Sequence, residues 1–148
     1  MEAFRTLKGF VEGSETDEPT YFGYSATLRI FGESLDFDDI TRTLGVPPTH
    51  SHRKGDRKGP RSPPSKHDMW MLSPDLPEER PLAEHIDTLW AAIRHSEAYL
   101  RQLKTIATVD VFLGYRSNVD TAGVEIPCAS LEMFVRLEIP LGLSIIIA

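Results

Sequence analysis

Two segments of the chain alternate apolar and polar residues, and this alternation limits the fold more than any other feature. Residues 24–31 and residues 107–113 both follow it. The apolar positions of the two segments are Ala26, Leu28, Ile30, Val109, Val111 and Leu113. A period of two indicates a strand with one buried and one polar face. Such strands argue against a sheet covered on both faces, so we expect a mixed or antiparallel sheet with helices on one face.

Helical periodicity is strongest over residues 81–104, which begin with Pro81, a residue suited to the first helical turn. The apolar stripe of this segment is Leu82, Ile86, Leu89, Trp90, Ile93, Leu100 and Leu103. Its length and continuity predict one long helix that packs on the sheet.

Two shorter helices are predicted on either side of the long one. In the first, Phe37, Ile40 and Leu44 share a face; Ser34 or Asp36 is the expected N-cap, and Gly45 the stop. The other follows Pro127, with an apolar face of Leu131, Phe134 and Val135.

Short apolar runs at residues 67–73 and 143–147 supply two further strands. The sequence therefore predicts a two-layer α+β fold: about four strands in a mixed or antiparallel sheet, with about three helices on one face. Residues 1–20 are acidic and predict a flexible lead, and residues 21–148 predict a single domain.

Cysteine content and hydropathy favour a reducing, cytoplasmic setting without membrane insertion. Cys128 is the single cysteine, and the N-terminal residues lack the apolar run of a secretory signal. The most apolar stretch, residues 139–148, is far shorter than the roughly 20 residues of a membrane-spanning helix. We interpret it as a buried strand.

Residues 49–67 form a basic segment in an acidic chain. They hold six of the 16 Lys and Arg residues and one acid, Asp56, whereas the whole chain has a net charge of −6. Three prolines and two glycines within the segment predict an exposed loop without regular structure. An anionic partner is attracted to such a loop.

Anion binding is the chemistry that this basic loop fits best. The candidate residues are Arg53, Lys54, Arg57, Lys58 and Arg61, with His52, His67 and Trp70 as secondary candidates. Gly55 and Gly59 allow backbone N–H groups to approach an anion closely. The loop has no phosphate-binding Gly-x-x-x-x-Gly-Lys motif and no stacking aromatics for nucleic acid. The alternative is that the loop is simply a solvated charged surface.

The sequence gives less support to a catalytic site or a metal site than to anion binding. His50 and His52, with His67 or Asp56, contain the atoms for a metal site, but the neighbouring cations oppose metal binding. Cys128 begins a predicted helix, where a thiolate is favoured, yet no base can be placed beside it. The acids at residues 36–39 are explained by helix capping. We therefore assign no catalytic residue, metal or cofactor.

Three motifs follow one another before residue 73: YSATLRIFG at 24–32, LDFDDITRTLGVPPT at 35–49, and HRKGD at 52–56. In this order, followed by Trp70 and Ser73, they resemble the bacterial domain-of-unknown-function family numbered 4279. The resemblance covers residues 21–148. It implies a small single-domain bacterial protein without an established activity, and it supplies no catalytic residue. The Pro- and Arg-rich continuation at residues 57–66 departs from the simpler family pattern.

The function that these patterns favour is a nonenzymatic module that binds another macromolecule, an unknown protein or anionic ligand, through the basic loop. One alternative is a small enzyme or binder acting on a phosphorylated or carboxylate small molecule, which predicts a pocket where the loop meets His67. Another is weak nucleic-acid binding, which predicts a steep loss of affinity with salt. Homodimerisation through the sheet face or the last strand is a further expectation.

Overall fold

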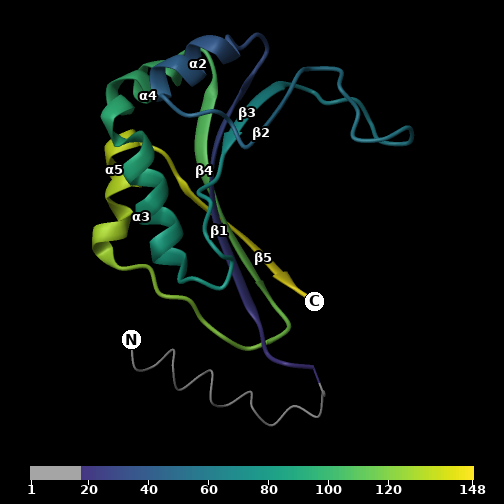
Figure 1. Cartoon of the computed structure of the whole chain (residues 1–148), viewed down its shortest axis with the longest axis vertical. Helices are drawn as coiled ribbons and strands as arrows, with labels where there is room; N and C mark the ends of the chain where they lie inside the picture. The colour runs from purple at the N-terminus through teal and green to yellow at the C-terminus, as the bar shows by residue number, and fades with distance from the viewer. Residues whose placement is uncertain (1–17) are drawn as a thin grey trace.

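One five-stranded sheet organises the protein, whose computed structural model describes residues 18–148 (Figure 1). The strands are β1 (Phe22–Gly32), β2 (His50–His52), β3 (Asp68–Leu72), β4 (Thr108–Ser117) and β5 (Leu141–Ile147). Their order is β2-β3-β1-β4-β5, with every pair antiparallel except β4 and β5, which are parallel. The mixed sheet confirms the predicted α+β class, with five strands where about four were expected. The acidic lead predicted over residues 1–20 lies almost wholly outside the described residues.

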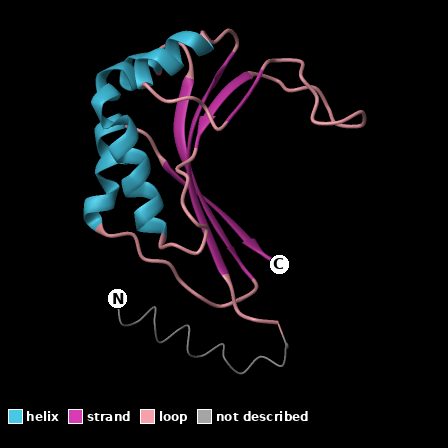
Figure 2. Cartoon of the chain, in the orientation of Figure 1, coloured by secondary structure: helices cyan, strands magenta, loops and turns pink. Residues whose placement is uncertain are grey.

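The helices of residues 18–148 lie together on one face of the sheet, and none of them covers the opposite face (Figure 2). They are α2 (Phe37–Leu44), α3 (Leu82–Ile93), α4 (Glu97–Leu103) and α5 (Glu132–Leu137), with 3₁₀ turns at Arg94–Ser96 and Cys128–Leu131. The one-sided arrangement confirms the prediction from the alternating strands. No helix within residues 18–148 has the length and apolar character required to cross a membrane.

The core forms between the inward faces of the central strands and the apolar stripe of α3. On β1, Ala26, Leu28 and Ile30 are fully buried, and on α3 Ile86 and Leu89 are buried to the same degree. These residues belong to one hydrophobic cluster that also takes in the inward residues of β4. The predicted alternation therefore marks the buried face correctly.

Short helix α2 has the caps that its sequence predicts. Asp36 accepts a hydrogen bond from the backbone N–H of Asp39 at 3.0 Å. Gly45 ends the helix in a left-handed conformation with φ of 76°, and its N–H donates to the carbonyl of Thr41 at 2.9 Å. Both ends of α2 are thus closed by capping hydrogen bonds.

The predicted single helix over residues 81–104 is wrong in one respect, because Arg94–Ser96 interrupt it as a 3₁₀ turn. Buried Ser96 donates its hydroxyl to the carbonyl of Thr43 at 3.2 Å, a contact with the end of α2. The interruption separates α3 from α4, and Leu100 of α4 is fully buried.

Val135 was predicted to lie on the apolar face of the helix that follows Pro127, but its side chain is 73% exposed.

The prediction of a buried last strand is also wrong. Strand β5 lies at the edge of the sheet, and Ile145, Ile146 and Ile147 are all exposed. Apolar runs indicate burial because most of them are covered, but within residues 18–148 only β4 pairs with this strand.

Candidate functional site

The basic loop begins and ends in the sheet. His50–His52 form β2 and pair with Met69–Met71 of β3, so the prediction of a segment without regular structure is wrong at its first residues. Thr49 holds this end in register, because its N–H donates to the carbonyl of Met71 at 2.8 Å. The rest of the loop projects from the sheet beyond the ends of β2 and β3 (Figure 1).

Backbone hydrogen bonds close the loop just beyond β2. The N–H of Gly55 donates to the carbonyl of Ser65 at 2.8 Å, and the N–H of Ser65 donates to the carbonyl of Asp56 at 2.7 Å. Gly55 has a φ of 92°, a conformation that glycine adopts without strain. These bonds join the two arms of the loop and leave residues 57–64 as its tip.

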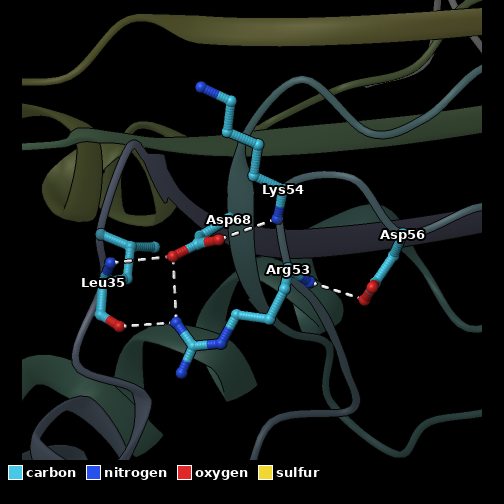
Figure 3. Close-up of polar contacts among 5 residues, drawn as sticks. All are labelled: Leu35, Arg53, Lys54, Asp56 and Asp68. Carbon is cyan, nitrogen blue, oxygen red and sulfur yellow. Dashed lines mark hydrogen bonds and ion pairs between the residues drawn. The ribbon is translucent and has the colours of Figure 1, made fainter.

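Asp68, the first residue of β3, fixes the base of the loop (Figure 3). Its carboxylate accepts hydrogen bonds from the backbone N–H groups of Lys54 at 2.8 Å and Leu35 at 3.0 Å, and from Nη1 of Arg53 at 2.9 Å. The side chain is almost fully buried. The N–H donors of Lys54 and Leu35, and then the Arg53 guanidinium, lower the pKa of this carboxyl.

Arg53 is occupied by contacts within the protein. Beyond Asp68, its Nη1 donates to the carbonyl of Leu35 at 2.7 Å, and its guanidinium lies 3.6 Å from the centre of the Phe37 ring. Its backbone N–H donates to Asp56 at 2.8 Å (Figure 3). Arg53 therefore connects the loop to the segment that precedes α2.

Lys54 is also paired, since its Nζ atom lies 2.9 Å from Oε2 of Glu33. The side chain extends away from Asp68 (Figure 3). The backbone N–H of Lys54 therefore contacts Asp68, while its side-chain ammonium contacts Glu33. Hydrogen bonding and charge attraction between Lys54 and Glu33 raise the pKa of the lysine and lower that of the glutamate. Two of the five predicted anion-binding residues thus have acidic partners.

The other three predicted residues, Arg57, Lys58 and Arg61, lie at the tip with exposed side chains. Within residues 18–148, no carboxylate lies within ion-pair distance of these cations or of Lys66. The Nη1 atom of Arg57 donates to the carbonyl of Ser62 at 2.9 Å, which folds the tip across itself. The structure therefore divides the predicted site into a paired base and a tip with uncompensated positive charge.

The secondary candidates lie in different environments. Trp70 is fully buried in the core, and its Nε1 donates to Oγ1 of Thr41 at 3.1 Å. His52 is half-buried with a ring nitrogen 3.1 Å from one of His50. His67 is exposed beside Phe31, with 5.8 Å between the ring centres. Trp70 is accordingly unavailable to a surface partner.

The hollow beside His67 does not contain the loop cations. It has a volume of about 500 Å³ and also includes Glu33 and Lys104 in its lining, but none of the five predicted anion-binding residues.

Cys128 is exposed at the start of a 3₁₀ turn. Across residues 18–148, no three His, Cys, Asp or Glu side chains are grouped so as to hold a metal ion.

A second hollow of about 510 Å³ is lined mainly by residues of β1, β4 and β5, together with the segment that follows β3 and His85 of α3. Its two arginines are paired: Arg29 makes two hydrogen bonds of 2.8 and 2.7 Å to Asp110, and Arg116 lies 2.9 Å from Glu78. Buried His85 lines the same hollow, and desolvation lowers its pKa. This hollow offers neutralised charges, in contrast to the tip of the basic loop.

The sequence analysis did not identify Asp68, although its hydrogen bonds hold the base of the basic loop in place. The available signal was an acid placed between a basic loop and an apolar strand, at a position that a strand pattern assigns to the buried face. A buried carboxylate requires donors, and the adjoining basic loop contains several, of which the structure uses Arg53 and Lys54.

Comparison with family models gives a match over residues 20–147 to a family described as a domain of unknown function, DUF4279. Comparison with curated proteins and with solved structures gives no match. The matched range includes every described strand and helix and the whole of the basic loop. The chain therefore belongs to the DUF4279 family.

Proposed function

We propose that this protein is a nonenzymatic binding module that uses the tip of the β2–β3 loop to bind an acidic surface on another protein. The contact residues are Arg57, Lys58 and Arg61, supported by Lys66. The observation that carries the proposal is the division of the loop into a base held by Asp68 and a tip whose cations have no acidic partner in residues 18–148.

The fixed base supports binding because it limits the entropy lost when a partner orders the loop. Asp68 joins both Arg53 and Lys54 to β3, and the paired arms at Gly55 and Ser65 continue that order outward. A loop held in this way presents its cations in a narrow range of positions. A freely solvated loop has no need of such anchoring.

A protein is favoured over nucleic acid as the partner by two features. The tip has no aromatic side chain to stack on bases, and buried Trp70 cannot supply one. Outside residues 49–67 the chain carries a formal charge of −11, which repels a long polyanion while permitting local contact with an acidic patch. We place the encounter in the cytoplasm, as the single cysteine favours, and in a bacterium, as the resemblance to the family implies.

The test is capture of partners from a nuclease-treated lysate of the native host. The bait proteins are the wild type, a tip variant with Arg57→Ser, Lys58→Ser and Arg61→Ser, and a control variant with Arg42→Ser, Arg80→Ser and Arg94→Ser. Both variants lose three positive charges from exposed positions, so a general charge effect acts on them equally. We expect a protein retained by the wild type and the control variant and lost from the tip variant.

Titration of the captured protein with each bait then measures the effect. We expect the tip variant to bind at least tenfold more weakly and the wild-type affinity to fall with salt, since exposed charges are screened. Equal capture by all three baits would reject the proposal. Retention found only in a parallel capture from untreated lysate would identify nucleic acid as the partner, and tip-dependent binding of inorganic phosphate alone would identify a small anion.

A further inference from the structure

Strand β5 presents an unpaired edge with exposed apolar side chains. It pairs with β4 on one side, from Val111 and Leu141 to Ser117 and Ile147, and no strand within residues 18–148 pairs with its other side. Ile145 is 61% exposed, Ile146 52% and Ile147 47%. Free backbone groups beside exposed apolar side chains are a template for another strand.

The edge lacks the devices that usually prevent strand addition. The seven residues of β5 include no charged residue and no proline, and the strand pairs with β4 without a bulge. The opposite edge of the sheet differs, since β2 is three residues long and carries His50 and His52. Of the two sheet edges within residues 18–148, β5 alone is long and apolar, so addition of one molecule's β5 to another's β2 would be poorly matched.

We propose that β5 pairs antiparallel with β5 of a second copy of this chain and joins the two sheets into one. This inference goes beyond the proposed function and uses a different part of the molecule. Full overlap of the two strands places Ser144 opposite Ser144 of the partner subunit, on the two-fold axis. Leu143 then lies opposite Ile145, Gly142 opposite Ile146, and Leu141 opposite Ile147.

A second copy is the favoured occupant because the edge is complementary to itself. In the full-overlap register each exposed isoleucine is opposite a leucine or glycine, and no charge faces another charge. A two-fold contact of this kind closes on itself and produces a dimer, whereas contact between unlike edges produces a filament. Neutral strands also allow two chains of net charge −6 to meet without acids at the contact.

The size of the contact sets the expected affinity. Two strands of seven residues bury less surface than the usual specific interface of about 1,600 Å². We therefore expect a dissociation constant in the micromolar range and a dimer fraction that rises with protein concentration. The loop tip lies away from β5 in the structure, so both tips remain free in the dimer (Figure 1).

The first experiment is sedimentation equilibrium of the full chain over a wide concentration range, comparing wild type, Ile145→Lys and Ile106→Lys. Lysine at residue 145 places two like charges at diagonal positions about 7–8 Å apart across the two-fold axis. Ile106 is 75% exposed and precedes β4, so the control makes the same substitution away from the edge. We expect the wild type and Ile106→Lys to dimerise, and Ile145→Lys to bind itself at least tenfold more weakly.

A second experiment tests the register. In a Cys128→Ser background, Ser144→Cys should form a disulfide across the axis, because directly opposite Cβ atoms lie about 4.5–5.5 Å apart. Oxidised glutathione takes up the two electrons and becomes two glutathione thiols. Ile146→Cys in the same background is the control, since in this register its two thiols lie four residues apart along the strands.

The outcomes are distinct. A concentration-dependent dimer weakened by Ile145→Lys, with crosslinking through residue 144 and not 146, supports the proposal. A monomer at every concentration overturns it and is also the result expected if another part of the chain covers the edge. A dimer unaffected by Ile145→Lys overturns it as well. Circular dichroism with equal unfolding midpoints confirms that the variants compared are folded.

Discussion

Nη1 of Arg53 lies 2.9 Å from Oδ2 of Asp68, and the same carboxylate accepts the backbone N–H groups of Lys54 and Leu35. One buried acid therefore joins three segments: the end of β2, the start of β3 and the approach to α2. The pair is asymmetric, because the Arg53 side chain is 51% exposed and that of Asp68 only 8%. Loss of Asp68 would consequently leave the buried N–H of Leu35 and the part-buried donors of Lys54 and Arg53 without this acceptor.

Asp68→Asn should loosen the base of the basic loop. An amide keeps one acceptor oxygen but turns an NH₂ group toward donors that the second carboxylate oxygen now accepts. We expect faster hydrogen exchange at the amides of Leu35 and Lys54 and a lower free energy of unfolding. Exchange monitored by NMR measures the local effect. Unchanged protection at both amides would contradict the assigned hydrogen bonds.

The stability of the protein should fall in acid partly through Asp68. Its folded pKa lies below the ordinary value of 3.8, so the carboxylate stabilises the fold fully at pH values well above 3.8. This contribution is lost as pH falls through the depressed folded pKa. We expect the difference in unfolding free energy between the wild type and Asp68→Asn to be constant near neutrality and to shrink below 3.8. Urea unfolding across acidic pH tests this, and a difference independent of pH would contradict it.

Gly114→Ala should destabilise the protein because Ser25 occupies the adjoining space. A Cβ atom at residue 114 would fall well inside contact distance of the Ser25 hydroxyl, but at an ordinary 3.6 Å from its Cβ. We expect a loss of about 1 kcal/mol, since the hydroxyl can rotate away. Adding Ser25→Ala should recover most of that loss. Urea unfolding of both single variants and the double variant measures it, and additive losses would rule out the contact as the cause.

The ion pair on the uncovered sheet face should contribute measurably to stability. Asp110 binds Arg29 through two hydrogen bonds, and the guanidinium lies 4.3 Å from the centre of the Phe112 ring. The hydrogen bond to Asp110 raises the pKa of Arg29. We expect Asp110→Ala to cost about 2 kcal/mol, as hydrogen bonds to charged groups do. A double-mutant cycle with Arg29→Ala isolates the pair, and a coupling energy of zero would show that the pair is not stabilising.

The sheet and its covered face could be predicted because local pattern determines them. Alternation in residues 24–31 depends only on which side of a strand faces the core, and the same side is buried in the structure. The caps of α2 were equally visible, since Asp36 and Gly45 act within one helical turn. Features of this kind require no knowledge of distant residues.

The missed features all depend on contacts between distant segments. The 3₁₀ turn at Ser96 involves a bond to Thr43, 53 residues away, and Asp68 gains its role from Leu35, 33 residues away. An apolar run such as β5 predicts a contact but not which surface supplies it. Basic residues likewise predict an anion without distinguishing an external partner from Glu33 or Asp68.

The pairing of β1 with β4 has a consequence for how the chain folds. Leu28 lies opposite Val111, so the central pair of the sheet joins segments separated by most of the domain. Closing such a long loop is slow, and although β3 can pair with one edge of β1 earlier, the other edge is unpaired until β4 has been synthesised. During translation β1 must therefore wait for β4, and β5 can be added to the sheet only after β4 is in place.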